Sequence, residues 1–166
     1  DPTRGAVIIC EGPWDWMALW EIEDSEGNDV NVVAVPGCNV WRDEWTEMCR
    51  NKYVTLWYDS DHPRDNGSRA GLDGMCRVAR KISGTASHIR WLRWGPNGYD
   101  ETKPSGWDVR DHLTSYADRR AALVALSSKV EDVPAEWLTV PSANGKSHVE
   151  SVESLPCSSW AACEKS

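Results

Sequence analysis

Short apolar runs alternate with longer amphipathic segments along the first hundred residues of this chain. Four such runs are bounded by Gly, Pro, Asn, Asp or Ser and have the length and the β-branched or aromatic content of strands. The expected strands cover residues 6–10, 31–35, 53–58 and 87–94. In the last of these, apolar side chains fall on both alternating sets of positions, so the pattern leaves open which face is buried.

Four segments between and after these strands have the pattern of helices. Residues 14–23 follow a Gly-Pro pair, and proline suits the first turn of a helix. Residues 68–82 repeat their apolar positions at helical spacing, at Leu72, Met75, Cys76, Ala79 and Ile82. The other two expected helices cover 41–49 and 116–128. Alternating strands and helices predict an α/β fold with about four mainly parallel strands, right-handed crossovers and helices on both faces.

The chain changes character near its end. From residue 133 onward, large apolar residues become scarce and Pro, Ser, Asn and Gly become frequent, which is typical of a linker. We therefore expect an α/β domain over 1–116, a C-terminal helix over 117–132, and a linker or disordered tail over 133–166 that leads to a further domain. Asp1 in place of Met favours a fragment of a longer protein.

Composition narrows the class of protein. The net charge of −8 argues against a uniform basic coat for nucleic acid, and no apolar run is long enough for a membrane helix. The charge is unevenly spread: residues 1–61 hold thirteen acids and four bases, whereas residues 62–94 hold two acids and seven bases. The single basic stretch therefore follows directly on the most acidic one.

The six cysteines do not form a metal motif. No C-x-x-C pair is present, and an α/β chain of this size does not need a disulfide framework. The first four cysteines are expected to be small buried residues. His148, Cys157 and Cys163 are widely spaced in the polar tail and are weak candidates for metal ligands.

Acidic residues follow the predicted strands where each one ends. Glu11 ends the first strand, and Asp59 and Asp61 end the third. Asp108 and Asp111 come after the fourth strand, and Asp15 lies one helical turn beyond Glu11. Ligands of open parallel sheets bind at the carboxyl ends of the strands, and Mg²⁺ prefers oxygen ligands. The alternative is that these are ordinary loop carboxylates, because a D-x-D pattern alone is weak.

Four ordered segments resemble the Toprim (topoisomerase–primase) family. Residues 7–15 (VIICEGPWD) are similar to its first motif, and 32–37 (VVAVPG) to its second strand and glycine turn. Residues 56–61 (LWYDSD) resemble its D-x-D motif, and 107–113 (WDVRDHL) resemble a late stretch of primases. The sequence departs from the pattern by an insertion at 62–66 and by Trp107, where primases often have Lys. The resemblance spans about 5–113 and is nearest to primases and primase–helicases of phages and mobile elements.

The resemblance implies a Rossmann-like Toprim fold and a set of site residues. Glu11 would be the general acid or base and also touch the metal, with Asp15 assisting. The implied ligands of Mg²⁺, or of Mn²⁺, are Glu11, Asp59, Asp61, Asp108 and Asp111. Gly12 would let the backbone turn closely beneath the bound nucleotide, and its alternative role is a plain strand-to-helix turn.

The basic stretch supplies candidates for phosphate contacts with nucleotide or nucleic acid. They are Arg64, Arg69, Arg77, Arg80 and Lys81. The alternative for the last three is a solvated helix face. Trp41 and Trp107 are candidates for base stacking, against the alternative of partial burial.

The leading functional hypothesis is the catalytic domain of a DNA primase. It implies nucleoside triphosphates, a single-stranded DNA template, a replicative helicase, fused or separate, as partner, and a cytoplasmic location in a bacterial or phage-infected cell. No P-loop occurs in the chain, so a helicase motor would lie outside it. The alternatives are a metal-dependent Toprim nuclease and a non-catalytic Toprim module of a replication protein.

Overall fold

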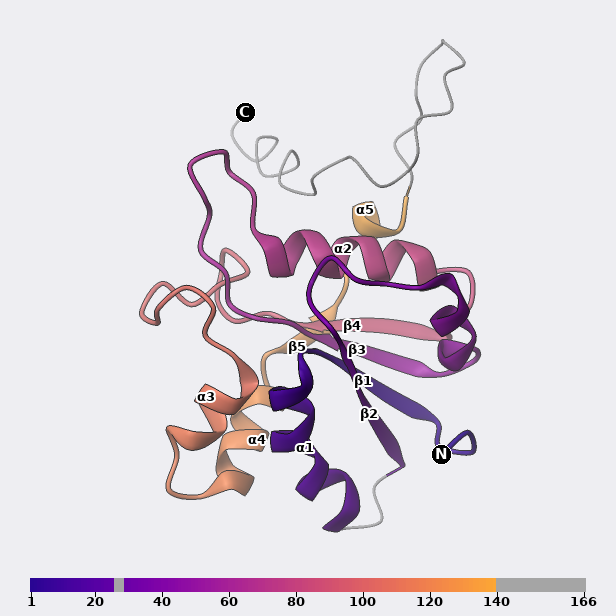
Figure 1. Ribbon diagram of the computed structural model, residues 1–166, viewed down its shortest axis with the longest axis horizontal. Helices are drawn as coiled ribbons and strands as arrows, with labels where there is room; N and C mark the ends of the chain where they lie inside the picture. Colours follow the sequence, from indigo (N-terminus) through magenta and orange to yellow (C-terminus); the bar gives the residue numbers. More distant parts are fainter. Residues whose placement is uncertain (26–28, 140–166) are drawn as a thin grey trace.

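The computed structural model describes residues 1–25 and 29–139, which form one sheet covered on both faces by helices (Figure 1). The strands are β1 (Ala6–Glu11), β2 (Val30–Val35), β3 (Tyr53–Trp57), β4 (His88–Leu92) and β5 (Val130–Asp132). Their order across the sheet is β2-β1-β3-β4-β5. The first four strands are parallel, and β5 pairs with β4 in the antiparallel sense. The predicted α/β class and mainly parallel sheet are confirmed.

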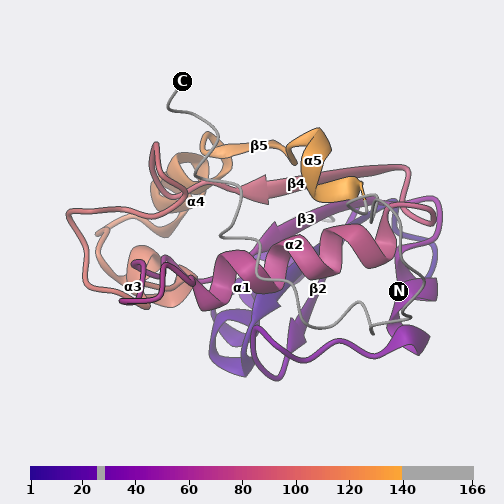
Figure 2. The same ribbon diagram turned by 90° about the horizontal axis from the view of Figure 1, so that it is seen from above.

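The helices divide between the two faces, as Figures 1 and 2 show. The helical elements are α1 (Pro13–Ser25), the 3-10 helix η1 (Asp43–Cys49), α2 (Ala70–Ile82), α3 (Val109–Thr114), α4 (Arg119–Ser127) and α5 (Ala135–Leu138). One core cluster joins the sheet to α2, η1 and α5, and the other joins it to α1, α3 and α4. The alternation of side chains along each strand feeds both clusters, because successive residues point to opposite faces.

Strand β4 resolves the ambiguity of its sequence pattern. Ile89 and Trp91 enter the cluster under α2, whereas Leu92 enters the cluster with α1, and Trp94 just beyond the strand joins it. Side chains of this strand therefore enter the core on both faces, as is usual for a strand inside a doubly covered sheet, whereas Arg90 is exposed.

The structure differs from the sequence-based expectation in three places. Residues 41–49 do not form an α-helix; a 3-10 helix covers Asp43–Cys49. The short strand β5 was not predicted, because three residues that include two acids do not have the pattern of a strand. The expected tail begins with Val133 and Trp137, which are buried in the core under α2. Residues 140–166, with His148, Cys157 and Cys163, lie outside the described residues.

Two further expectations concern membrane-spanning helices and buried cysteines. None of these helices is long and apolar enough to cross a membrane. Cys10 and Cys49 are buried free thiols, as expected of small core residues. Cys38 is also a free thiol, but it is only half-buried. Its position near the candidate site, described below, explains the difference.

Gly74 in α2 is required by a close contact with the loop that follows β2. A Cβ atom at residue 74 would lie 2.4 Å from the backbone carbonyl oxygen of Cys38. We expect Gly74→Ala to lower the free energy of unfolding by about 1–3 kcal/mol, since backbone must shift to admit the methyl group. Urea denaturation measures this change.

A matched control is available just after the same helix. Gly84 has open space around its Cα and no positive φ. Gly84→Ala is therefore expected to change stability by no more than about 0.5 kcal/mol. Equal effects of the two substitutions would contradict the close contact at Gly74.

Candidate functional site

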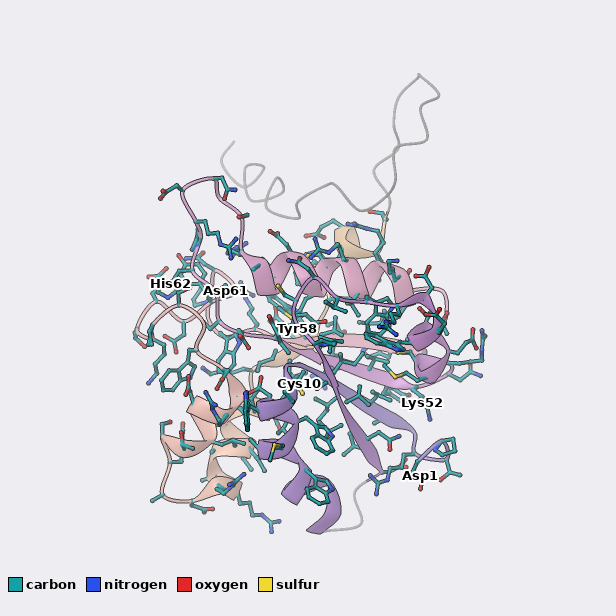
Figure 3. The ribbon with its side chains drawn as sticks, viewed as in Figure 1. Asp1, Cys10, Lys52, Tyr58, Asp61 and His62 are labelled. Carbon is teal, nitrogen blue, oxygen red and sulfur yellow. The ribbon has the colours of Figure 1, made fainter. Side chains whose placement is uncertain are left out.

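The carboxyl ends of β1 and β3 meet at the point where the chain reverses its direction of travel across the sheet. From β1 the chain crosses to β2 on one side, and from β3 it crosses to β4 on the other. Such a switch point leaves a crevice at the strand ends, where ligands of open α/β sheets bind. Asp61 and His62 lie beyond the strands at this end, whereas Asp1 and Lys52 lie at the opposite end (Figure 3).

Glu11 is held at the switch point by the loop that follows the neighbouring strand. Its Oε1 accepts a hydrogen bond of 3.0 Å from the backbone N–H of Cys38, and its Oε2 is buried without a partner. Burial is the main cause that raises the pKa of Glu11. Gly12 follows with φ near +95°, and its N–H donates to the carbonyl of Val35 at 2.8 Å. Glycine adopts this left-handed conformation without strain, so the turn keeps the chain close to β2.

The two aspartates after β3 differ in their surroundings. Asp61 Oδ2 accepts a hydrogen bond of 2.7 Å from the backbone N–H of Gly71, at the start of α2. This contact ties Asp61 to the positive end of the helix dipole. Asp59 Oδ1, by contrast, is buried without a partner. The two carboxylates of the D-x-D pair are therefore positioned by different means.

Ser60, between these aspartates, joins the site to the loop after β4. Its backbone pairs with Trp107 in an isolated antiparallel bridge, and its hydroxyl accepts a hydrogen bond of 2.8 Å from the N–H of Asp100. Ser60 is completely buried. The bridge places Asp108, the next residue after Trp107, beside the end of β3.

Asp108 and Asp15 are connected through the start of α3. Asp108 caps this helix, and its Oδ1 accepts a hydrogen bond of 2.6 Å from the N–H of Asp111. Asp15, in the first turn of α1, accepts a hydrogen bond of 3.2 Å from the N–H of Arg110. Asp15 therefore fixes the helix that presents Asp108. The carboxylate of Asp111 is more exposed and lies 3.9 Å from the Arg110 guanidinium.

The carboxylates raise one another's proton affinity. The pKa of Asp59 is raised to about 9, first by burial and then by the charges of Glu11, Asp15, Asp108 and Asp61. The pKa of Asp15 is raised to about 7 by burial and then by Asp108. Like charges in a poorly solvated site disfavour ionisation unless a cation neutralises them. The site is therefore built to gain stability from a bound cation.

The chemistry of these groups fits a hard divalent cation. Three buried carboxylate oxygens accept no hydrogen bond and are therefore candidates to bind a cation. They are Glu11 Oε2, Asp15 Oδ2 and Asp59 Oδ1. Carboxylate oxygens are the ligands that Mg²⁺ prefers. Within residues 1–25 and 29–139, no three His, Cys, Asp or Glu side chains converge closely enough to hold an ion together. These carboxylate oxygens are thus of the type that Mg²⁺ prefers, and the side chains would have to move closer together to bind the ion.

Comparison with protein families agrees with this arrangement. A family model described as Toprim-like matches residues 8–99, more than half of the chain. The chain belongs to the Toprim-like family. Comparison with curated proteins and with solved structures gave no match. Toprim domains act in DNA metabolism, are often catalytic there, and generally bind Mg²⁺. The matched residues contain Glu11, Asp59 and Asp61, whereas Asp108 and Asp111 lie beyond them.

The basic residues of this Toprim-like domain separate into two groups. Arg64 is exposed in the loop before α2, and Arg69 donates to the carbonyl of Asn97 and lies 5.9 Å from the ring centre of Tyr99. Arg77 instead contacts Asn39 in the loop after β2, and Lys81 contacts Asp43 at the start of η1. Arg80 is half-buried, and its Nε has no hydrogen-bond partner. The structure therefore places Arg77 and Lys81, but not Arg64, beside the loop that holds Glu11.

Sequence reasoning did not identify three residues that position the Toprim-like site. Cys38 supplies the N–H that holds Glu11, and Ser60 forms the bridge to Trp107, the residue before Asp108. Tyr58 has a fully buried hydroxyl without a partner. The pKa of Tyr58 is raised by burial and then by Glu11 and Cys38. The only signal in the sequence is position, since Cys38 directly follows Pro36-Gly37 and Ser60 lies inside the D-x-D motif. Backbone contacts of this kind leave no signal in residue type.

Proposed function

We propose that this Toprim-like domain is the catalytic domain of a DNA primase, which makes primers on single-stranded DNA by metal-dependent nucleotidyl transfer. The observation that supports it is the set of partnerless, buried carboxylate oxygens at the switch point, with Asp108 brought beside Asp59. Asp108 belongs to the segment that resembles primases, and the bridge between its neighbour Trp107 and Ser60 of the D-x-D motif favours a primase over a nuclease.

Glu11 is the proposed general base. In the reaction, the 3′-oxygen of the primer attacks the α-phosphorus of a nucleoside triphosphate, the bond to the β-phosphate bridging oxygen breaks, and pyrophosphate leaves. The proton of the 3′-hydroxyl passes to Oε2 of Glu11, the oxygen without a donor. The raised pKa of Glu11 makes it a stronger base than an exposed carboxylate.

The aspartates have a supporting role in the same proposal. A bound Mg²⁺ or Mn²⁺ would supply positive charge that neutralises the phosphates. Asp59, Asp61 and Asp108 would hold the ion, and Asp111 would join them at the exposed side. Asp15 holds α3 in place through Arg110, which keeps Asp108 in position.

Primer synthesis tests the proposal directly. The protein is incubated with single-stranded DNA, Mg²⁺ or Mn²⁺ and labelled nucleotides. We expect short products that require nucleotides, template and metal together. Labelled DNA incubated with metal but no nucleotides is the second arm, and cleavage there would favour the nuclease. Absence of both activities, together with no Mg²⁺ binding by calorimetry, would favour the non-catalytic module.

A further inference from the structure

A groove of about 390 Å³ lies between α2 and the loop that follows β2. Figure 1 shows this loop running from β2 beside α2 toward η1. The residues that matter for its chemistry are Cys38, Asn39, Trp41, Gly74, Arg77 and Lys81. The groove belongs to neither the carboxylate cluster nor the loop of Arg64 and Arg69, so the site described above does not account for it.

The walls of the groove are fixed by specific contacts. Gly74 lets the carbonyl of Cys38 approach α2 more closely than a Cβ would permit. The indole N–H of Trp41 donates to the Thr46 hydroxyl at 3.2 Å, and its ring packs edge-on to Trp45 with 5.8 Å between centres. These contacts hold the aromatic ring in place, so the groove is formed before any ligand arrives.

The groove is positively charged, whereas the chain as a whole is acidic. Two of its lining residues, Arg77 and Lys81, are cationic and none is acidic, although the net charge of the protein is −8. Arg77 donates to the neutral amide of Asn39. Lys81 pairs at 2.8 Å with Asp43, whose side chain is 86% exposed. An exposed ion pair of this kind contributes little to stability. A phosphate could therefore replace the Asp43 carboxylate as the partner of Lys81 at a small cost in free energy.

The groove is adjacent to the proposed general base. Cys38 lines the groove and also donates its backbone N–H to Glu11 at 3.0 Å. Arg77 and Lys81 are one helical turn apart, since they occupy positions i and i+4 of α2. An anionic chain that lies along α2 would therefore pass from Lys81 past Arg77 toward the carboxylates.

We propose that this groove binds one strand of single-stranded DNA, with Arg77 and Lys81 on successive phosphates and Trp41 against a base. A cationic track combined with an aromatic ring is the common way in which proteins hold single strands. The volume of about 390 Å³ suits one or two nucleotides. The inference rests on the proposed function in taking DNA as the substrate, and it adds the path by which the strand reaches Glu11.

Binding of a fluorescent oligonucleotide of about 12 residues tests this groove. Anisotropy is measured in EDTA, so that neither synthesis nor cleavage occurs, and at several salt concentrations. We expect Arg77→Gln and Lys81→Gln each to weaken binding by about 3- to 10-fold and to reduce the salt slope by about 1. Trp41→Leu should weaken binding by about 10-fold with an unchanged salt slope, and Trp41→Phe should retain part of the affinity.

The control is Arg50→Gln, which removes an exposed cation that pairs with Glu47 and lies outside the groove. It should bind as the wild type does. Wild-type affinity and salt slope in both Arg77→Gln and Lys81→Gln would overturn the proposal, and so would tighter binding of a duplex of the same sequence. Circular dichroism of each variant separates loss of folding from loss of contact.

The outcome is independent of the primase assay. If the wild type makes primers but the groove variants bind normally, the groove assignment fails and the proposed function stands. If the groove variants lose binding while the wild type makes no primer, the groove assignment stands and the primase proposal fails.

Discussion

Asp59→Asn is expected to stabilise the metal-free protein while removing its metal-dependent activity. The wild-type carboxyl has a pKa of about 9 in the folded state because burial and four neighbouring carboxylates oppose its charge. An amide of nearly the same shape has no charge to bury. At pH 8 without metal, we expect the free energy of unfolding to rise by about 2 kcal/mol, a discounted part of the full shift because the side chain keeps some contact with water.

The pH dependence of stability follows from the upward shift of the Asp59 pKa. Between the unfolded pKa near 3.8 and the folded pKa near 9, the folded state binds the proton of Asp59 and the unfolded state does not. The stability of the metal-free wild type therefore falls as the pH rises through this window. Asp15, whose pKa is raised to about 7, contributes in the same direction. Urea denaturation in EDTA between pH 5 and 9 should show a smaller decrease in the free energy of unfolding for Asp59→Asn than for the wild type.

Added Mg²⁺ should make the wild type more stable than Asp59→Asn, the reverse of their order in EDTA. The cation stabilises a wild type that can bind it, and this gain should be absent or much smaller in Asp59→Asn. Loss of this ligand should lower metal affinity or activity by at least about 100-fold. Asp65→Asn, in an exposed loop, is the matched control and should leave both properties unchanged. A variant that is less stable than the wild type in EDTA would contradict the electrostatic account of Asp59.

Glu11→Gln is expected to lower the rate of nucleotidyl transfer by about 10²- to 10⁴-fold, the range for loss of a general base. Glutamine can still accept the hydrogen bond from Cys38 through its side-chain oxygen, so the local structure should persist. It cannot take up the proton of the attacking hydroxyl. The effect should fall mainly on kcat, and single-turnover kinetics with saturating nucleotide would measure it.

The control for this substitution is Glu44→Gln, which changes an exposed glutamate in η1. The thermal unfolding temperature of Glu11→Gln in metal-free buffer should be equal to or higher than that of the wild type, because the substitution removes one of the buried like charges. A rate within about 3-fold of the wild type would remove Glu11 from the role of base. If Glu11→Gln and Asp59→Asn were both fully active, the proposed primase site would be wrong.

The strands and the order of the carboxylates could be predicted because both are encoded locally. Apolar runs bounded by turn residues predicted β1 to β4, and the acidic residues that follow β1 and β3 do lie at one end of the sheet. The prediction of a metal site rested on residue type and on position relative to the strands. No side-chain contact had to be known for that step.

The contacts that complete the site were not predictable in the same way. Ser60 and Trp107 are far apart in sequence, and their bridge depends on how the loop after β4 folds back. Asp15 was expected to support Glu11, but its hydrogen bond is to Arg110 in α3. Arg77 and Arg64 both belong to the basic stretch, yet only Arg77 lies in the groove beside Cys38. These distinctions depend on tertiary packing, which residue type does not reveal.

The two outer strands of the sheet are protected against further pairing by different means. At one edge, β5 has only three residues, and the acidic pair Glu131 and Asp132 discourages another strand from joining it. At the other edge, β2 is six residues long, rich in valine, and pairs only with β1 among the described strands. Two of its carbonyls, however, already accept side-chain hydrogen bonds: Val30 from the Arg4 guanidinium at 2.7 Å and Val32 from the Trp16 indole at 3.1 Å. A strand added at this edge would have to displace both. Within the described part of the chain, acidic side chains therefore protect the short edge strand of the sheet, and side-chain hydrogen bonds from Arg4 and Trp16 protect the long one.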